Sequence, residues 1–155
     1  FFYVSRSIPQ RLAEIGAALV AAFGIRRKFF HFEFFVRHGE YVPMEINSRP
    51  PGGPILDMMN FSVDGDLYRA WASVVTGQSV DLPREKKFAV GYVGRKDRSY
   101  RLSHEEVLSR FGPLLVETAE NPPVFQGIMG RTRYLFRSEN EADMPIIAAA
   151  VRQTG

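Results

Sequence analysis

Two aromatic-rich segments joined by a His-Gly pair constrain the fold of this chain more than any other feature. Residues 28–37 and 41–47 alternate large apolar side chains with polar ones, which predicts two β-strands. We expect an antiparallel hairpin whose two apolar faces coincide on one side of the sheet. The side chains predicted for that face are Phe30, Phe32, Phe34 and Val36 with Val42, Met44 and Ile46.

The polar residues then gather on the opposite face of the predicted hairpin. If the apolar faces coincide, Glu33 lies across from Glu45, and Asn47 shares their face. This register requires an odd-length connection, for example a three-residue loop over residues 38–40. A two-residue loop would place Glu33 opposite Met44 and mix the two faces. The packing and the chemistry of the hairpin therefore demand the same register.

Two carboxylates on facing strands repel each other unless a cation lies between them. The carboxylates of Glu33 and Glu45 and the amide of Asn47 offer hard oxygen ligands, which suit Mg²⁺ or Mn²⁺. Arg49 follows at once, and the Gly-Gly pair at 52–53 permits close approach of the backbone to an anion. The pattern therefore indicates a site for a divalent cation and an anion.

Two alternatives stay open at this stage. The carboxylates could instead be solvated on an exposed sheet face and paired with Arg37 or Lys28, because strand carboxylates are usually exposed. His31 lies on the Glu33 face, where it would either contact a phosphate or substrate or simply have its hydrogen bonds satisfied within the sheet.

Helical and extended patterns alternate irregularly along the remaining sequence, which predicts the α+β class. A helix is expected over residues 8–24, and the motifs Ser7-x-x-Gln10, Ser103-x-x-Glu106 and Ser138-x-x-Glu141 are predicted to be capping boxes at helix starts. We expect three parts along the chain. They are a first domain with the metal site over 1–77, a connector over 78–86, and a small α+β lobe over 87–155.

Composition excludes several classes of site. The chain has no cysteine, so disulfides, thiolate zinc sites and cysteine nucleophiles are excluded, and a cytoplasmic location is expected. No apolar run is long enough to span a membrane. The formal net charge is only +3, which is weak support for nucleic acid as a partner. The stretches "GRKDRSYR" and "GRTRYLFR" interleave bases with aromatic residues, but exposed strands commonly carry such side chains.

The motif residues resemble a known superfamily. Glu33 within "HFEFF", followed by "MEINSRPPGG", is similar to the C-terminal half of the ATP-grasp superfamily. The nearest subset is the carboxylate–amine ligases, including carbamoyl-phosphate-synthase-like proteins and amino-acid ligases. The resemblance implies an antiparallel β-sheet with flanking helices, followed by a small α+β lobe. It further implies that Glu33, Glu45 and Asn47 bind Mg²⁺, and that Arg49 is catalytic and meets a phosphate of ATP or the acyl-phosphate intermediate. His31, by its position on the Glu33 face, is a further candidate for a contact to ATP.

The resemblance also implies partners. An intact ligase of this type would use ATP, a small-molecule carboxylate and an amine, and a homo-oligomer is compatible with it. The sequence begins with Phe-Phe-Tyr, and we expect it to be a piece of a longer protein. In the superfamily the adenine-contacting segment and the phosphate-binding lysines lie upstream, so we expect this chain alone to be inactive. The alternative is a non-enzymatic basic α+β module that binds RNA or a protein partner.

Overall fold

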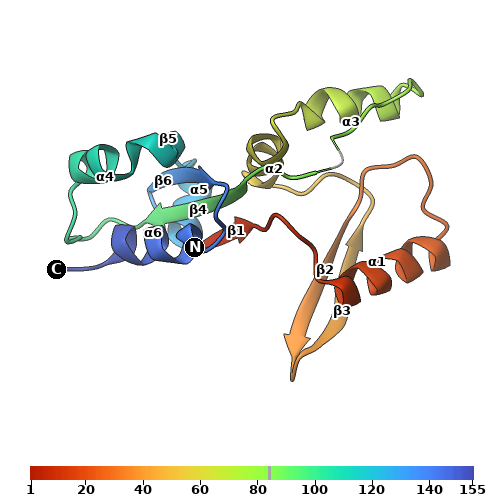
Figure 1. Ribbon diagram of the computed structural model, residues 1–155, viewed down its shortest axis with the longest axis horizontal. Helices are drawn as coiled ribbons and strands as arrows, with labels where there is room; N and C mark the ends of the chain where they lie inside the picture. Colours follow the sequence, from red (N-terminus) through yellow and green to blue (C-terminus); the bar gives the residue numbers. More distant parts are fainter. Residues whose placement is uncertain (84) are drawn as a thin grey trace. The chain divides into compact units, whose positions relative to one another are not determined.

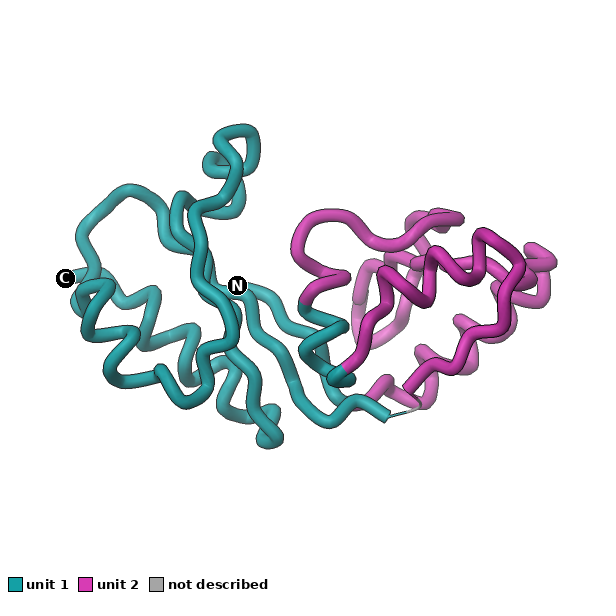
Figure 2. The backbone as a smooth tube through the Cα atoms, turned by 90° about the horizontal axis from the view of Figure 1, so that it is seen from above, with its two compact units in different colours: residues 1–6, 58–64, 85–155 teal, residues 7–57, 65–84 magenta. Residues whose placement is uncertain are grey.

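The computed structural model describes residues 1–83 and 85–155, and its helices and strands are labelled in Figure 1. The chain divides into two units, which Figure 2 shows in different colours. Unit 1 comprises residues 1–6, 58–64 and 85–155, and unit 2 comprises residues 7–57 and 65–84. The α+β class is confirmed. Residue 84 of the predicted connector lies outside the described residues.

Unit 1 is built on a four-stranded antiparallel sheet of order β1-β4-β6-β5. Its central strands β4 and β6 are each paired with a neighbouring strand on both sides. The strands are β1 (Phe2–Val4), β4 (Ala89–Arg95), β5 (Leu115–Glu120) and β6 (Thr132–Ser138). The helices are α4 (His104–Phe111), a 3₁₀ turn η1 (Gly112–Leu114), α5 (Pro123–Met129) and α6 (Asp143–Arg152), and α2 (Ile55–Val63) contributes residues to both units.

Both faces of this sheet are covered. The strand sequence of β4 is almost continuously apolar, which is typical of a strand that is buried on both sides. Alternate side chains therefore enter two cores, and α6 packs along β4 in one of them (Figure 1). The first core contains Ala89, Val93, Val107, Tyr134, Phe136, Met144, Ile147, Ala148 and Val151. The second contains Met58, Val90, Tyr92 and Leu135.

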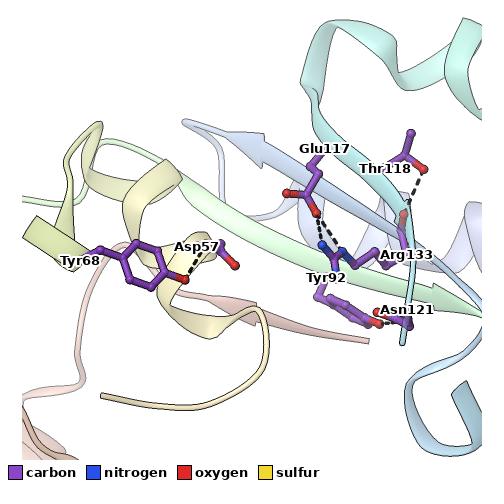
Figure 3. Close-up of polar contacts among 7 residues, drawn as sticks. All are labelled: Asp57, Tyr68, Tyr92, Glu117, Thr118, Asn121 and Arg133. Carbon is purple, nitrogen blue, oxygen red and sulfur yellow. Dashed lines mark hydrogen bonds and ion pairs between the residues drawn. The ribbon is translucent and has the colours of Figure 1, made fainter. Parts of the chain in front are cut away.

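Polar contacts connect the edge of unit 1 to its centre, as Figure 3 shows. The half-buried Arg133 of β6 forms an ion pair with Glu117 of β5 at 2.8 Å. The Tyr92 hydroxyl accepts a hydrogen bond from the Asn121 amide at 2.7 Å and donates one to the Met129 carbonyl at 3.1 Å. Burial raises the pKa of Tyr92, while the bond from Asn121 opposes that shift. These contacts hold α5 and the end of β5 against β4.

Gly94 of β4 lies against the backbone at the end of α5. A Cβ atom added at Gly94 would overlap the carbonyl oxygen of Met129, which is backbone and cannot rotate away. We therefore expect Gly94→Ala to lower the free energy of unfolding by about 1–3 kcal/mol or more. Gly112→Ala is the matched control, because nothing lies within 4 Å of the added atom and the backbone there is helical. Urea denaturation of both variants checks this, and equal stabilities would contradict the close approach.

Unit 2 contains a two-stranded sheet and two helices. Its elements are α1 (Gln10–Ala22), β2 (His31–Arg37), β3 (Glu40–Asn47) and α3 (Leu67–Val75). Helix α1 ends as predicted at Gly24, whose φ is +59°. The amides of Gly24 and Ile25 donate to the carbonyls of Ala21 and Val20, which is the Schellman arrangement. Pro50 and Pro54 in the turn after β3, and Leu56 at the start of α2, are buried.

One of the three predicted capping boxes forms. Ser103 accepts from the amide of Glu106, and the Glu106 carboxylate accepts from the Ser103 amide at 2.7 Å. This bond lowers the pKa of Glu106. The other two predictions were wrong. Helix α1 begins at Gln10 after Pro9 without a side-chain cap, and Ser7 plays no part.

The predicted box at the last helix fails because its glutamate has other partners. Helix α6 begins at Asp143, five residues after Ser138. The Glu141 carboxylate accepts bonds from the Ser5 hydroxyl and from the Arg6 amide at 3.0 Å. The bond from the Arg6 amide is the main cause that lowers the pKa of Glu141. A contact distant in sequence thus outcompetes the local cap.

Strand β1 and helices α2 and α5 were not predicted, and one helix face differs from the prediction. Strand β1 and helix α5 had no clear sequence pattern, because both are short and α5 is exposed along most of its length. For α3 the sequence pattern predicts a buried side made of Leu67, Trp71, Val74 and Val75. Leu67 is buried as predicted, but Trp71 and Val75 are exposed, and Ala70 is buried in addition. This helix is capped by the Asp66 carboxylate, which accepts from the Arg69 amide.

Candidate metal site on the β2–β3 hairpin

The predicted pairing of the two carboxylates is confirmed, although the chain reaches it differently. Glu33 lies directly opposite Glu45, and His31 lies opposite Asn47. The loop has only two residues, His38 and Gly39, with φ of 50° and 82°, as a type I′ turn requires. The predicted three-residue loop was therefore wrong.

A β-bulge in β3 compensates for the shorter turn. The register shifts between Glu33 and Phe34, which lies opposite Pro43, so Met44 is an extra residue without a partner. The shift restores the pairing of the carboxylates but changes the apolar face near the turn. Tyr41 joins that face, with its ring centroid 6.4 Å from the Phe34 ring, while Val42 and Met44 are exposed. The prediction that Val42 and Met44 share the buried face was wrong.

The aromatic side chains on the apolar face hold the strand in place. The rings of Phe30 and Phe32 have centroids 5.0 Å apart, and those of Phe32 and Phe34 are 6.2 Å apart. All three side chains are half-buried. Because side chains alternate along a strand, anchoring these three aligns His31 and Glu33 on the other face.

Asn47 and Glu45 are joined by a hydrogen bond on the polar face. The amide Nδ2 of Asn47 donates to Oε1 of Glu45 at 2.7 Å. This bond orients the Asn47 amide, whose oxygen makes no hydrogen bond to the described residues and stays available as an acceptor. Glu45 keeps its second carboxylate oxygen for another partner. The pair thus presents two oxygen atoms that could act as metal ligands, the amide oxygen of Asn47 and the second carboxylate oxygen of Glu45.

His31 lies between the Arg49 carbonyl and the Glu33 carboxylate. Its Nδ1 lies 3.0 Å from the carbonyl oxygen of Arg49, which can only accept a hydrogen bond, so Nδ1 carries the proton. In the neutral ring, Nε2 is then a lone-pair acceptor, and it lies 3.7 Å from Oε1 of Glu33. The side chain is 17% exposed, whereas that of Glu33 is 46% exposed. His31 therefore braces the turn after β3 and faces the carboxylates.

Arg49 lies in the turn that follows β3. One guanidinium nitrogen donates to the Pro50 carbonyl at 3.1 Å, and the side chain is exposed. Within the described part of the chain Arg49 forms no ion pair. Gly53 has φ of +62°, as its turn requires. Arg49 is thus an unneutralised cation two residues after Asn47.

The hairpin offers two carboxylates and an amide oxygen on one face, which are the ligand types that a hard divalent cation takes. In residues 1–83 and 85–155 no lysine or arginine forms an ion pair with Glu33 or Glu45, so pairing with Arg37 or Lys28 is not seen. The described residues contain no group of three or more His, Asp or Glu side chains placed to hold a metal ion. Two carboxylates and an amide oxygen would leave the shell incomplete. Mg²⁺ commonly completes such a shell with water and substrate phosphates.

A cavity of about 360 Å³ lies at the same end of unit 2. It is lined by Arg27 and Lys28, by Ser48 directly after Asn47, and by Trp71 of α3. Arg27 donates to the Gly77 carbonyl at 3.2 Å. From the sequence, Lys28 is expected only as a possible partner for the carboxylates. Its place in this cavity follows from the loop before β2 meeting α3, which no local pattern indicates.

Comparisons with known proteins give the fold a wider context. No family model matches the chain, and no curated protein matches it either. Solved structures do match. One is phosphoribosylglycinamide synthetase from Anaerococcus prevotii, with a TM-score of 0.59 and 12% identity over 96% of this chain. Another is the phosphoribosylaminoimidazole carboxylase ATPase subunit from Aquifex aeolicus, with a TM-score of 0.60 and 16% identity over 97% of this chain.

The chain spans 43% and 46% of the length of these two structures, which is less than half of each. None of its described helices combines the length and apolar character that crossing a membrane would require. Both solved structures are ATP-grasp enzymes, so the resemblance seen in the motif residues is confirmed at the level of the fold. Over nearly its whole length, this chain has a fold similar to part of an ATP-grasp enzyme.

Proposed function

We propose that this chain forms part of an ATP-dependent carboxylate–amine ligase. In this proposal Glu33, Glu45 and Asn47 hold Mg²⁺, or Mn²⁺ in its place, against the phosphates of ATP. The observation that carries it is the cross-strand pairing of Glu33 with Glu45, with Asn47 bonded to Glu45 on the same face. The similarity in fold to ATP-grasp enzymes supports the same assignment.

Each residue of the hairpin has a separate task. The two carboxylates supply negative charge, and the Asn47 amide oxygen adds a neutral donor. Bound Mg²⁺ supplies positive charge that offsets the charge on the phosphates. His31, held by the Arg49 carbonyl, presents Nε2 toward Glu33 at the edge of the site. Together these groups position the phosphates before transfer.

Arg49 acts on the transferring group. The γ-phosphoryl of ATP passes to an oxygen of the substrate carboxylate, giving ADP and an acyl phosphate. An amine then attacks the acyl carbon, phosphate leaves, and the nitrogen loses a proton. The exposed guanidinium of Arg49 donates to oxygens whose negative charge grows during transfer, which lowers the barrier.

The remaining contacts to ATP belong, in this proposal, to residues outside these 155 positions. A small-molecule carboxylate and an amine are the expected co-substrates. This chain alone would then not ligate them or hydrolyse ATP at a useful rate, because three donors bind Mg²⁺ weakly without phosphates. A metal-binding experiment on the chain itself is therefore the direct test.

Paramagnetic Mn²⁺ should broaden the amide resonances around the hairpin donors of the ¹⁵N-labelled chain in the presence of ATP. The Glu45→Gln variant should need an Mn²⁺ concentration about 10–100-fold higher to reach the same broadening. The substitution removes one ligand charge and keeps the side-chain shape. Glu40→Gln, on the same strand opposite Arg37, is the matched control and should leave the titration unchanged. Broadening centred elsewhere, or equal titrations of both variants, would contradict the metal site.

A further inference from the structure

The two basic stretches of the sequence have different roles in unit 1. The arginines of "GRTRYLFR" all form ion pairs with carboxylates of the same unit. Arg131 pairs with Glu120 at 3.1 Å, Arg133 with Glu117 at 2.8 Å (Figure 3), and Arg137 with Asp64 at 2.7 Å. These arginines are therefore structural.

The stretch over residues 95–101, here called the basic loop, keeps its charge. It carries Arg95, Lys96, Arg98 and Arg101 against a single carboxylate, Asp97. None of these four cations forms an ion pair with the part of the chain that the structure describes. Positive charge is thus concentrated at the end of β4 and in the loop that follows it.

A cavity of about 490 Å³ lies against the basic loop. Its volume falls within the range of small-molecule sites. Arg95, Lys96 and Arg98 line it, together with residues at the ends of β5 and β6 and with His104 at the start of α4. The carboxylates in the lining are Asp97 and Glu120, and Glu120 is already paired with Arg131. The cavity therefore has an excess of positive charge.

Arg95 is a buried cation in this lining. It is 6% exposed, and its Nε donates to the Val151 carbonyl at 2.7 Å. Its Nη2 is buried and has no hydrogen-bond partner among the described residues. A buried guanidinium without a counter-ion is costly, because it has lost its water without gaining a negative partner. An anion in the cavity would supply that partner.

Tyrosines hold the cations in place. The Arg95 guanidinium lies 4.5 Å from the centre of the Tyr100 ring, and that of Arg98 lies 5.4 Å from it. The Tyr100 hydroxyl accepts from the Lys96 amide at 2.8 Å and from Arg98 Nε at 3.3 Å. His104 Nδ1 lies 2.8 Å from the Tyr134 hydroxyl. These contacts pre-organise the lining, so an entering anion meets cations already ordered.

We propose that this cavity binds the phosphate or carboxylate group of a small ligand. The site consists of residues of unit 1 only and does not depend on the metal site of the hairpin. A small anion is favoured over a nucleic acid. The cations surround a cavity rather than a ridge, and the ring of Tyr100 is occupied by guanidinium groups instead of being open for base stacking.

The test is titration of the chain with pyrophosphate and with citrate at constant ionic strength, by calorimetry. The double variant Lys96→Gln/Arg98→Gln should lose about tenfold or more in affinity, because charge-assisted hydrogen bonds are removed. The control Arg101→Gln/Arg110→Gln removes two exposed cations of unit 1 that do not line the cavity. It should change the affinity by less than about twofold, because these side chains do not line the cavity and act on the anion only from a distance, where salt screens them.

The outcomes separate the sources of binding. Preference for pyrophosphate or for citrate identifies which oxyanion the site takes. Equal losses in both double variants would show diffuse attraction and overturn the proposal, as would tighter, strongly salt-dependent binding of a single-stranded RNA. Binding of neither anion would overturn it too. Should the double variant unfold, Lys96→Gln alone keeps the test, because that side chain makes no hydrogen bond to the described residues.

Discussion

Replacing Glu45 with glutamine in the full-length protein should lower Mg²⁺-dependent ADP release by about 100-fold or more. Removal of groups that merely orient a metal ligand costs about 10–100-fold, and Glu45 is proposed as a ligand itself. The fold should be unaffected, because glutamine keeps the shape and Glu45 is exposed on the hairpin. ADP release at saturating Mg²⁺ and ATP, over a panel of amino-acid and dicarboxylate substrates, measures the effect.

Two further variants sharpen this experiment. Glu40→Gln removes a charge from the same strand away from the donors and should retain activity. Arg49→Ala should lower kcat more than it raises KM if its guanidinium acts mainly on the transferring group. Undiminished turnover in Glu45→Gln would remove the central residue of the proposed function. It would leave the anion cavity of unit 1 untouched, so the two proposals fail separately.

Phe136→Ala should lower the free energy of unfolding of unit 1 by about 3–5 kcal/mol. Phe136 is 1% exposed in the first core, where its ring stacks on Tyr134 at 6.1 Å and meets Phe111 edge-on at 6.0 Å. The truncation leaves a cavity among side chains from β4, β6, α4 and α6, which are joined to several elements and cannot close in easily. Urea denaturation followed through amide signals of β4 and β6 reports this unit directly.

Ile128→Ala is the control for that measurement. Ile128 belongs to the same unit, but its side chain is 87% exposed on α5. Its truncation should therefore change the unfolding free energy by less than about 0.5 kcal/mol. A loss below about 1 kcal/mol for Phe136→Ala would show that the core is not closed around this ring.

The local features of the chain were determined by the sequence alone. Alternation of aromatic and polar side chains predicted the hairpin, and the need to bury Phe32 and Phe34 together placed Glu33 opposite Glu45. The box at Ser103 and Glu106 and the end of α1 at Gly24 were equally readable. The cap and the helix end depend on residues within a few positions of one another, and the hairpin depends on two consecutive strands, so these interactions form wherever the rest of the chain lies.

Only the tertiary structure decided the features that depend on distant partners. Glu141 was available for a local cap by its position, but Ser5 and Arg6 bind it instead. The turn at His38 could have had two or three residues, and the choice depended on a bulge at Met44 that keeps the aromatic face continuous. In such cases two arrangements with similar local energies compete, and long-range packing selects between them.

The same reasoning explains why ion pairs neutralise one basic stretch and not the other, although the two are similar in sequence. Arg133 is neutralised because β5 pairs with β6 and brings Glu117 beside it. Arg95 instead contacts the Val151 carbonyl of α6 and the rings of Tyr100 and Tyr134, and no carboxylate of the described residues pairs with it. Charge pattern alone states how many cations a segment carries. Whether each one is paired, buried or presented to a cavity is set by which strands and helices become its neighbours, because Coulomb interactions fall off with distance in space and not along the chain.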